Sequence, residues 1–231
     1  MKHLKLFFAL GLITAIGYAQ KVIEKNFDHK GQFIEMNMAF ASEIDVRTWD
    51  KQTVYFKATL SSENPELLDF YKIDITENDD RLLIASNTEA FFDAYKAKRK
   101  KENKKYWCHE YEFNYVLYVP EKAKFKIKSI NGSLTSNEIN GDFEADLING
   151  NIEIERYSGN LVLNTINGEI DLKVGNANFI AETIHGDIYA DERLDLTSYD
   201  RHVGQKVENA TPNRSNRLKL NTINGNMYLR L

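Results

Sequence analysis

The stretch that decides the fold, residues 130–186, reads INGSLTSNEINGDFEADLINGNIEIERYSGNLVLNTINGEIDLKVGNANFIAETIHG. Within it the tripeptide Ile-Asn-Gly, or a near relative, recurs at every eighteenth position and places glycines at Gly132, Gly150, Gly168 and Gly186. Gly141 and Gly159 lie midway, so each of the first units divides into two equal halves. Self-similarity at a fixed period is the signature of a repeat architecture.

Each half of the repeat predicts a short strand. Apolar or small residues recur at the second and fourth positions after the glycine, for example at Ile152 and Ile154 after Gly150. Polar residues occupy most of the places between them, so alternate side chains should point inward. Another apolar residue stands two positions before the glycine, as Ile148 does, and we expect it to join the buried set. The Asn-Gly pair suits a tight corner because it adopts left-handed backbone angles at low cost.

Stacked repeats bring residues one full repeat apart into parallel ladders with a spacing of about 4.8 Å. The asparagines of the Ile-Asn-Gly units should then form a corner ladder of amides, with a histidine in the same register. Its members are Asn131, Asn149, Asn167, His185 and, from a last copy of the motif, Asn224. We interpret the ladder as structural, as in other stacked β architectures. The alternative is a groove for a polar ligand along the corner.

These patterns predict an all-β protein, specifically a single-domain parallel β-solenoid, or right-handed β-helix, with 18-residue rungs. Residues 20–120 predict a less regular N-terminal β portion, and residues 121–231 the regular rungs. Residues 220–225 repeat residues 163–168 letter for letter as LNTING. We expect this last rung, which runs to Leu231 without an obvious polar cap, to expose unpaired backbone groups and to favour end-to-end self-association.

Residues 1–19 have the features of a secretory signal peptide: Lys2 and Lys5, an apolar run over residues 6–16, and Ala19 at the cleavage position. Removal of two of the 30 basic residues leaves 28 against 34 acidic ones, a formal net charge of −6. We therefore expect an exported protein of the periplasm or the cell surface, with no nucleic-acid partner and no integral membrane segment after cleavage. Cys108 is the only cysteine, which excludes an intrachain disulfide.

Residues 87–105 differ in composition from their surroundings and are interpreted as a basic insertion. One interpretation is a solvated hairpin tip or a short charged helix. The other is a binding patch for an anionic ligand or a membrane surface, in which aromatic side chains lie beside cationic ones. The residues of this candidate patch are Phe91, Phe92, Tyr95, Lys96, Lys98, Arg99, Lys100 and Lys101.

Several features together resemble the bacterial family called putative adhesins, exported β-strand-repeat domains of unknown function. They are a tyrosine-rich strand ending in Val119-Pro120, a lysine-rich strand, the Ile130-Asn131-Gly132 series and the closing Thr222-Ile223-Asn224-Gly225. The resemblance spans about residues 30–231. It implies an exported β-solenoid and brings no catalytic residues with it. The insertion at 87–105 departs from the family's pattern.

Two further kinds of chemistry occur on stacked β repeats. A calcium-binding β-roll needs Gly-Gly-x-Gly-x-Asp, and the chain contains no Gly-Gly. Glu169 and Asp187, one repeat apart, would stack as like charges and form a weaker metal candidate. A polysaccharide-active β-helix would use an outward acidic face, and the candidates are Glu144, Glu153, Glu155 and Asp171, with Lys173 above Glu155.

We therefore expect a non-catalytic, adhesin-like envelope scaffold or binding protein that acts through extended faces, without cofactor or metal. Its partner would be a cell-surface glycan or an envelope protein. The alternative is a carbohydrate-active β-helix that binds or cleaves polysaccharide with its acidic face.

Overall fold

The computed structural model describes residues 20–102, 111–174, 177–199, 201–209 and 216–231. The predicted signal peptide, Cys108, and Lys104 and Lys105 of the insertion lie outside these residues. Within the described ranges, no helix has the length and apolar character needed to cross a membrane.

Most of the described chain forms strands, as the alternation of polar and apolar residues predicts. The strands are β1 (Gln20–Asp28), β2 (Phe33–Trp49), β3 (Thr53–Ser62), β4 (Lys72–Glu77), β5 (Arg81–Asn87), β6 (Tyr111–Pro120), β7 (Ala123–Ser136), β8 (Ile139–Asn149), β9 (Ile152–Ile154), β10 (Tyr157–Ser158), β11 (Leu161–Asn167), β12 (Ile170–Lys173), β13 (Asn178–His185), β14 (Ile188–Ala190), β15 (Thr197–Tyr199), β16 (Gln205–Glu208), β17 (Arg217–Asn224) and β18 (Met227–Arg230). A 3-10 helix, η1 (Pro65–Phe70), and one α-helix, α1 (Glu89–Lys101), complete the described elements. The predicted all-β class is confirmed.

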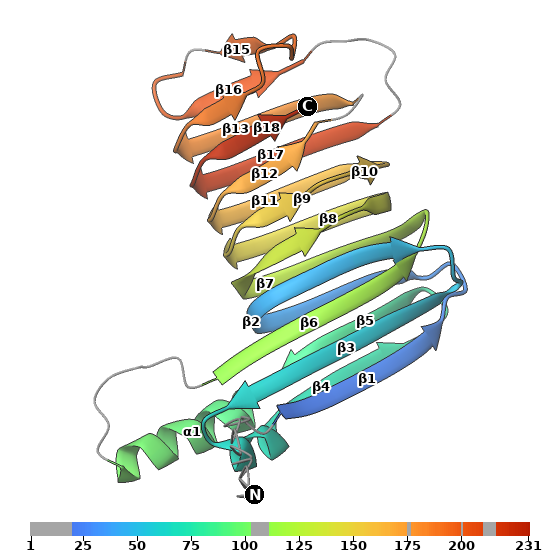
Figure 1. The fold of residues 1–231 in the computed structure, drawn as a ribbon, viewed down its shortest axis with the longest axis vertical. Helices are drawn as coiled ribbons and strands as arrows, with labels where there is room; N and C mark the ends of the chain where they lie inside the picture. Colours follow the sequence, from blue (N-terminus) through green and yellow to red (C-terminus); the bar gives the residue numbers. More distant parts are fainter. Residues whose placement is uncertain (1–19, 103–110, 175–176, 200, 210–215) are drawn as a thin grey trace, which may run out of the picture.

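The strands stack along the long axis of the molecule (Figure 1) and form two walls. Backbone pairing orders one wall as β4, β5, the first part of β2, the first part of β7, β8, β11, β17, β13, β16 and β15. It orders the other as β1, β3, β6, the second part of β2, the second part of β7, β9, β12, β18 and β14. A rung here means the two strand segments, one from each wall, that follow each other at one level.

The rungs do not follow one another in space as they do in sequence. The β17–β18 rung lies between β11–β12 and β13–β14 and pairs in parallel with both. The expectation that the rung ending at Leu231 is an open end of the stack is therefore wrong. In the wall that contains β17 and β13, β16 pairs with the outer edge of β13, and β15 pairs with β16.

The sheet is mixed rather than wholly parallel. Pairing is parallel from β5 and β6 through β2 to β13 and β14, but β4, β3 and β1 at one end and β16 and β15 at the other pair antiparallel. The long strand β2, placed by the sequence in the irregular portion, pairs with β7 along both walls, with a register shift between Phe40 and Glu43. The parallel stack therefore begins before residue 121.

Side chains that point inward from the two walls form one apolar cluster. The positions two and four residues after the repeat glycines are buried from Leu134 to Leu172, as predicted. Alternate residues of β6, from Phe113 to Val119, are buried as well. The apolar positions of the alternating pattern are therefore the residues that form the core along most of the stack.

The Asn-Gly corners need glycine for two different reasons. Gly132 has a φ of +114°, the left-handed conformation that the motif predicts. Gly168 and Gly225 do not have left-handed φ values, and glycine is required there by close approach of two backbones. A Cβ on Gly168 would lie 2.0 Å from the carbonyl oxygen of Gly150, and a Cβ on Gly225 would lie 2.0 Å from that of Gly168. Stacking at these corners thus excludes any side chain.

Candidate binding surface

Ile139, which precedes Asn140-Gly141 at a half-repeat, is buried as expected. The isoleucines two positions before Gly132, Gly150, Gly168, Gly186 and Gly225 instead point outward, which corrects the expectation that they are buried. Between 38% and 45% of each is exposed. Strand pairing places them in one line, which we call the isoleucine row: Ile130, Ile148, Ile166, Ile223 and Ile184. Four steps of about 4.8 Å give the row a length of about 19 Å.

The residue before each isoleucine explains its direction. Thr165, Thr222 and Thr183 are buried, and each donates its hydroxyl hydrogen bond to a glycine carbonyl in the next rung. The distances are 2.9 Å from Thr165 Oγ1 to Gly150 O, and 3.0 Å both from Thr222 Oγ1 to Gly168 O and from Thr183 Oγ1 to Gly225 O. Because neighbouring side chains of a strand point to opposite faces, an inward threonine turns the following isoleucine outward.

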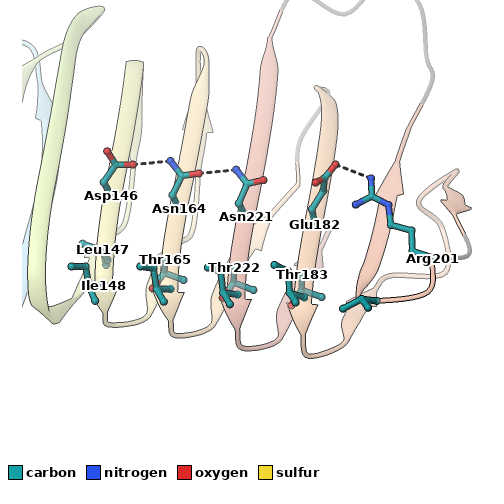
Figure 2. A pocket seen from close by; sticks show the side chains of 14 residues that line it. Asp146, Leu147, Ile148, Asn164, Thr165, Glu182, Thr183, Arg201, Asn221 and Thr222 are labelled. Carbon is teal, nitrogen blue, oxygen red and sulfur yellow. Dashed lines mark hydrogen bonds and ion pairs between the residues drawn. The ribbon is translucent and has the colours of Figure 1, made fainter.

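A groove of about 500 Å³ lies between the isoleucine row and a parallel row of polar side chains (Figure 2). The polar row consists of Asp146, Asn164, Asn221 and Glu182. Asn164 donates to Asp146 Oδ1 and Asn221 donates to Asn164 Oδ1, each at 2.7 Å. Arg201, 3.4 Å from Glu182, and Val203 line the groove at the β16 end. The groove is therefore apolar on one side and lined by amides and carboxylates on the other.

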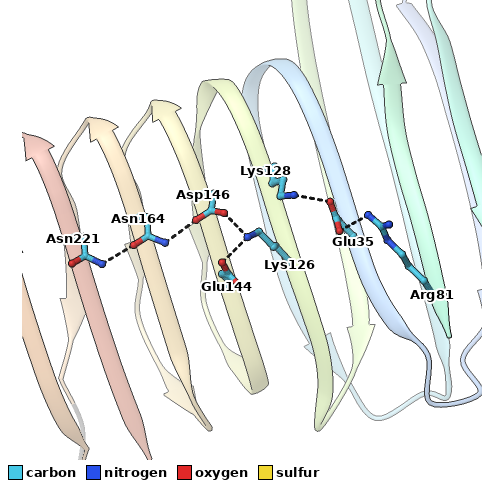
Figure 3. Close-up of polar contacts among 8 residues, drawn as sticks. All are labelled: Glu35, Arg81, Lys126, Lys128, Glu144, Asp146, Asn164 and Asn221. Atoms are coloured by element: carbon cyan, nitrogen blue, oxygen red, sulfur yellow. Dashed lines mark hydrogen bonds and ion pairs between the residues drawn. The ribbon is translucent and has the colours of Figure 1, made fainter.

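Carboxylates around the groove are neutralised by cations from neighbouring strands (Figure 3). Lys126 forms ion pairs with Asp146 and, at 2.5 Å, with Glu144. Burial acts to raise the pKa of the Asp146 carboxyl, but hydrogen bonds from Lys126 and Asn164 outweigh it and hold that pKa below its ordinary value. Asp146 is therefore charged near neutral pH and compensated.

The same polar face continues beyond Lys126 toward β5. Glu35, whose side chain is 9% exposed, pairs with Arg81 at 2.6 Å and with Lys128 at 3.1 Å. Burial acts to raise the pKa of Glu35, and the hydrogen bonds and charges of Lys128 and Arg81 overcome it and lower that pKa. Ion pairs across strands thus stabilise this face without leaving an uncompensated acid at Glu35.

The corner ladder lies beside the isoleucine row. Asn149 donates to Asn131 at 3.0 Å, Asn167 to Asn149 at 2.8 Å and Asn224 to Asn167 at 2.7 Å, always from Nδ2 to Oδ1. His185 is in register with Asn224, not directly with Asn167. The amides therefore bond one another along the stack and border the isoleucine row with a polar edge.

The candidate patch of the basic insertion lies on α1. Phe91 and Tyr95 are buried, and Phe91 packs against Phe113 at a ring-centroid distance of 5.2 Å. Phe92 is half-buried and contacts Phe40. The helix thus directs its aromatic side chains toward the body of the protein, with Arg99, also buried, on the same side.

The lysines of the patch lie on the other sides of α1. Lys96, Lys100 and Lys101 are exposed. Lys98 forms an ion pair with Glu66 at 2.5 Å, and Lys96 forms one with Asp93 at 3.6 Å. The structure therefore separates the lysines from the aromatic rings that the patch was expected to present beside them.

The residues of the proposed acidic face are partly paired with cations. Glu155 lies 2.6 Å from Lys173, as its position predicts, and Arg230 reaches Asp171 at 2.6 Å and Glu155 at 3.4 Å. The hydrogen bond from Lys173 is the main cause that lowers the pKa of the Glu155 carboxyl. Glu153 is exposed.

The expected stack of Glu169 and Asp187 does not occur. Asn226 of the β17–β18 rung lies between them, donating to Glu169 Oε1 at 3.3 Å and accepting from the backbone nitrogen of Asp187 at 3.0 Å. Among the described residues, no group of three or more His, Cys, Asp or Glu is placed to hold a metal ion.

Comparisons with known proteins identify likenesses in structure only. No family model matches the sequence, and no curated protein does. A putative cell adhesion protein from Clostridium sporogenes is similar at 12% identity with a TM-score of 0.57, over 92% of this chain and 99% of that chain. A putative adhesin from Bacteroides fragilis aligns over 93% of this chain and 99% of that chain, at 11% identity and a TM-score of 0.30. The first likeness indicates a shared fold.

Proposed function

We propose that the protein is a non-catalytic, exported, adhesin-like binding protein whose contact surface is the isoleucine row and its groove. The observation that carries the proposal is the line of five exposed isoleucines along one corner. Contiguous apolar patches on soluble proteins commonly mark interaction sites. Here the row is bordered by bonded amides, the arrangement of an apolar centre with a polar rim that protein interfaces use.

The partner is inferred to be an envelope protein rather than a glycan. An apolar row about 19 Å long matches an apolar strip on another protein. The amides of the bordering ladder already bond one another, which leaves fewer groups for sugar hydroxyls. The resemblance to adhesins supports a role outside the cytoplasm, and the C. sporogenes structure with a similar fold is called a putative cell adhesion protein.

The scaffold is inferred to be a right-handed β-solenoid with antiparallel ends. Support comes from the registers of the parallel strands, in which Asn131, Asn149 and Asn167 pair successively at a constant spacing of one repeat. Right-handed crossovers are the rule for parallel strands in one sheet, at roughly 98%. Such a rod presents the same outward row at every level.

A binding role is favoured over polysaccharide cleavage by the state of the carboxyl groups. Glycosidases need one carboxylic acid with a raised pKa as the proton donor. Of the candidate acidic face, Glu155 has a lowered pKa because Lys173 and Arg230 hydrogen-bond to it. Elsewhere on the outward surface, hydrogen bonds from cations or amides lower the pKa values of Glu35 and Asp146 in the same way. These groups are held as carboxylates.

The proposal is tested by measuring binding of purified residues 20–231 to outer-envelope proteins of the source bacterium and, in parallel, to a glycan array. The double variant Ile166→Asn/Ile223→Asn should weaken envelope-protein binding by tenfold or more and keep the melting temperature within a few degrees. Val22→Asn is the matched control, since Val22 is also exposed but lies on β1. Equal binding by both variants, or binding by neither wild type nor control, would refute the proposal.

A further inference from the structure

The β17–β18 rung occupies a slot made by two other rungs. Leu220 pairs with Leu163 on one side and with Ala181 on the other. In the second wall Leu229 pairs with Leu172 on one side and with Ala190 on the other. The rung is thus held by parallel backbone pairing on both edges and in both walls.

The two rungs that form the slot match each other as well. Leu163 and Ala181 are separated in the chain by one full repeat, and so are Asn167 and His185, which both pair with Asn224. This is the spacing at which Asn149 and Asn167 pair directly. If β17–β18 were withdrawn, β11–β12 and β13–β14 could close in the regular register. The β17–β18 rung is therefore inserted between two rungs that would be in register without it.

Recognition in the slot uses groups that repeat along the stack. Thr222 donates to Gly168 O on one side, and Thr183 donates to Gly225 O on the other, each at 3.0 Å. Asn221 bonds Asn164 at 2.7 Å. Leu218, Leu220, Met227 and Leu229 of the rung are buried. The slot accordingly selects a strand with inward leucine and threonine and outward asparagine, and every copy of this chain carries such a strand.

We propose that β17–β18 is exchangeable between copies: the slot of one molecule accepts the β17–β18 rung of a second, giving a reciprocally swapped dimer. Exchange replaces each contact in the slot by the identical contact from the partner, so the two forms differ mainly in the entropy of association. Withdrawal from a folded molecule breaks pairing on both edges, so exchange should be slow in the native protein. Folding at high concentration should favour it.

The test is a disulfide across the slot. The variant Asn164→Cys/Asn221→Cys, in a Cys108→Ser background, replaces two hydrogen-bonded outward side chains on paired strands. Neighbouring strands about 4.8 Å apart satisfy disulfide geometry. After refolding and oxidation, an unswapped molecule forms the bond within one chain, and a swapped pair forms it between two chains. A non-reducing denaturing gel separates these products.

The matched control is Asp146→Cys/Asn164→Cys, which joins two rungs on the same side of the slot. We expect covalent dimer in the test variant to rise with refolding concentration, at least fivefold above the control at the highest concentration. A second test pair, Asn167→Cys/Asn224→Cys, keeps the experiment decisive if the first fails to fold or oxidise. Monomer bands alone in the oxidised test pair, or equal dimer in test and control, would overturn the proposal.

Discussion

Asn221 donates its side-chain amide to Asn164 Oδ1 at 2.7 Å although the two residues are 57 positions apart in the chain. The next side chain in the same row, Asp146, is 18 positions from Asn164 and accepts an equally short hydrogen bond from it. Neighbours in space therefore come from neighbouring repeats on one side and from a distant repeat on the other. The polar row nevertheless places one asparagine beside the other, because Asn164 and Asn221 occupy the same position in the two copies of LNTING.

The close approach of backbones at the corners predicts that Gly168→Ala is severely destabilising. Its Cβ would lie 2.0 Å from Gly150 O, and that atom is backbone and cannot move without displacing a rung. We expect a loss of more than about 3 kcal/mol in the free energy of unfolding, the range of severe core disruption. Urea denaturation followed by circular dichroism measures it.

Gly31→Ala is the control for this substitution. Gly31 has a φ of +95°, but a Cβ at this position would have nothing within 4 Å, so only backbone strain of about 1–2 kcal/mol should result. If Gly168→Ala is no more costly than Gly31→Ala, the corners tolerate a side chain and the close-approach explanation is wrong.

The inward threonines predict a second effect. Thr222→Val keeps the shape of the side chain and removes the hydroxyl that donates to Gly168 O at 3.0 Å. A buried carbonyl that loses its donor costs about 1–3 kcal/mol. Gly168 is half-buried, so the free energy of unfolding from urea denaturation should fall by about 1 kcal/mol, the low end of this range, at an unchanged slope. Thr135→Val serves for comparison because Thr135 is exposed, and it should change stability by no more than about 0.5 kcal/mol. Equal effects of the two would exclude a role for the hydroxyl bond.

The parity of the strands explains what the sequence could and could not predict. Positions after each glycine, such as Ile152 and Ile154, are buried as their alternation indicates. Before Gly168 the buried positions are Thr165 and Leu163, which lie three and five residues from it. Even-numbered positions are thus buried after this corner and odd-numbered positions before it, so Ile166 is exposed. A prediction that assumes unbroken alternation across the corner therefore places Ile166 in the core, although its side chain points outward. An outward isoleucine and an inward one are equally compatible with the composition of a strand.

The order of the rungs was not predictable from the repeat itself. One rung can fit beside rungs from different places in the sequence in the same register, as the pairing of Asn224 with both Asn167 and His185 demonstrates. The identity of residues 163–168 and 220–225 is the one sequence signal that would have suggested adjacency. The groove depends on this order, because Asn221 and Ile223 complete two of its rows and Arg201 and Val203 enter from the β15–β16 region. Its composition could not be assembled from the repeat spacing alone.

The buried tyrosine pair predicts a loss of stability at alkaline pH. Tyr71 and Tyr115 are hydrogen-bonded through their hydroxyls, and burial raises the pKa of Tyr71 from 10.0 to about 12. The folded pKa exceeds the unfolded one, so this contribution is complete below pH 10 and is lost as pH rises from 10 to about 12. A shift of this size corresponds to roughly 3 kcal/mol.

The measurement is the free energy of unfolding between pH 8 and 11, with tyrosinate absorbance recorded in parallel. Tyr71→Phe should be less stable at pH 8 but should lose less stability on going to pH 11. Tyr199→Phe is the control, since Tyr199 is an exposed residue on β15. A wild-type stability that stays constant to pH 11 would contradict the buried pair.

The two sides of α1 predict opposite outcomes for the basic insertion. Phe91 is fully buried against Phe113, so Phe91→Ala should cost about 3–5 kcal/mol, the usual cost of removing a core phenylalanine. The triple variant Lys96→Gln/Lys100→Gln/Lys101→Gln changes exposed side chains and should leave the unfolding free energy within about 0.5 kcal/mol of the wild-type value.

The inward aromatic rings of α1 also predict how the protein behaves toward membranes. We expect wild type and triple variant to bind vesicles of anionic phospholipid equally weakly at about 150 mM salt, a condition that screens surface charge over about 8 Å. Strong vesicle binding by wild type that the triple variant loses would instead establish the lysines of α1 as a membrane-binding surface, with no contribution required from the aromatic residues.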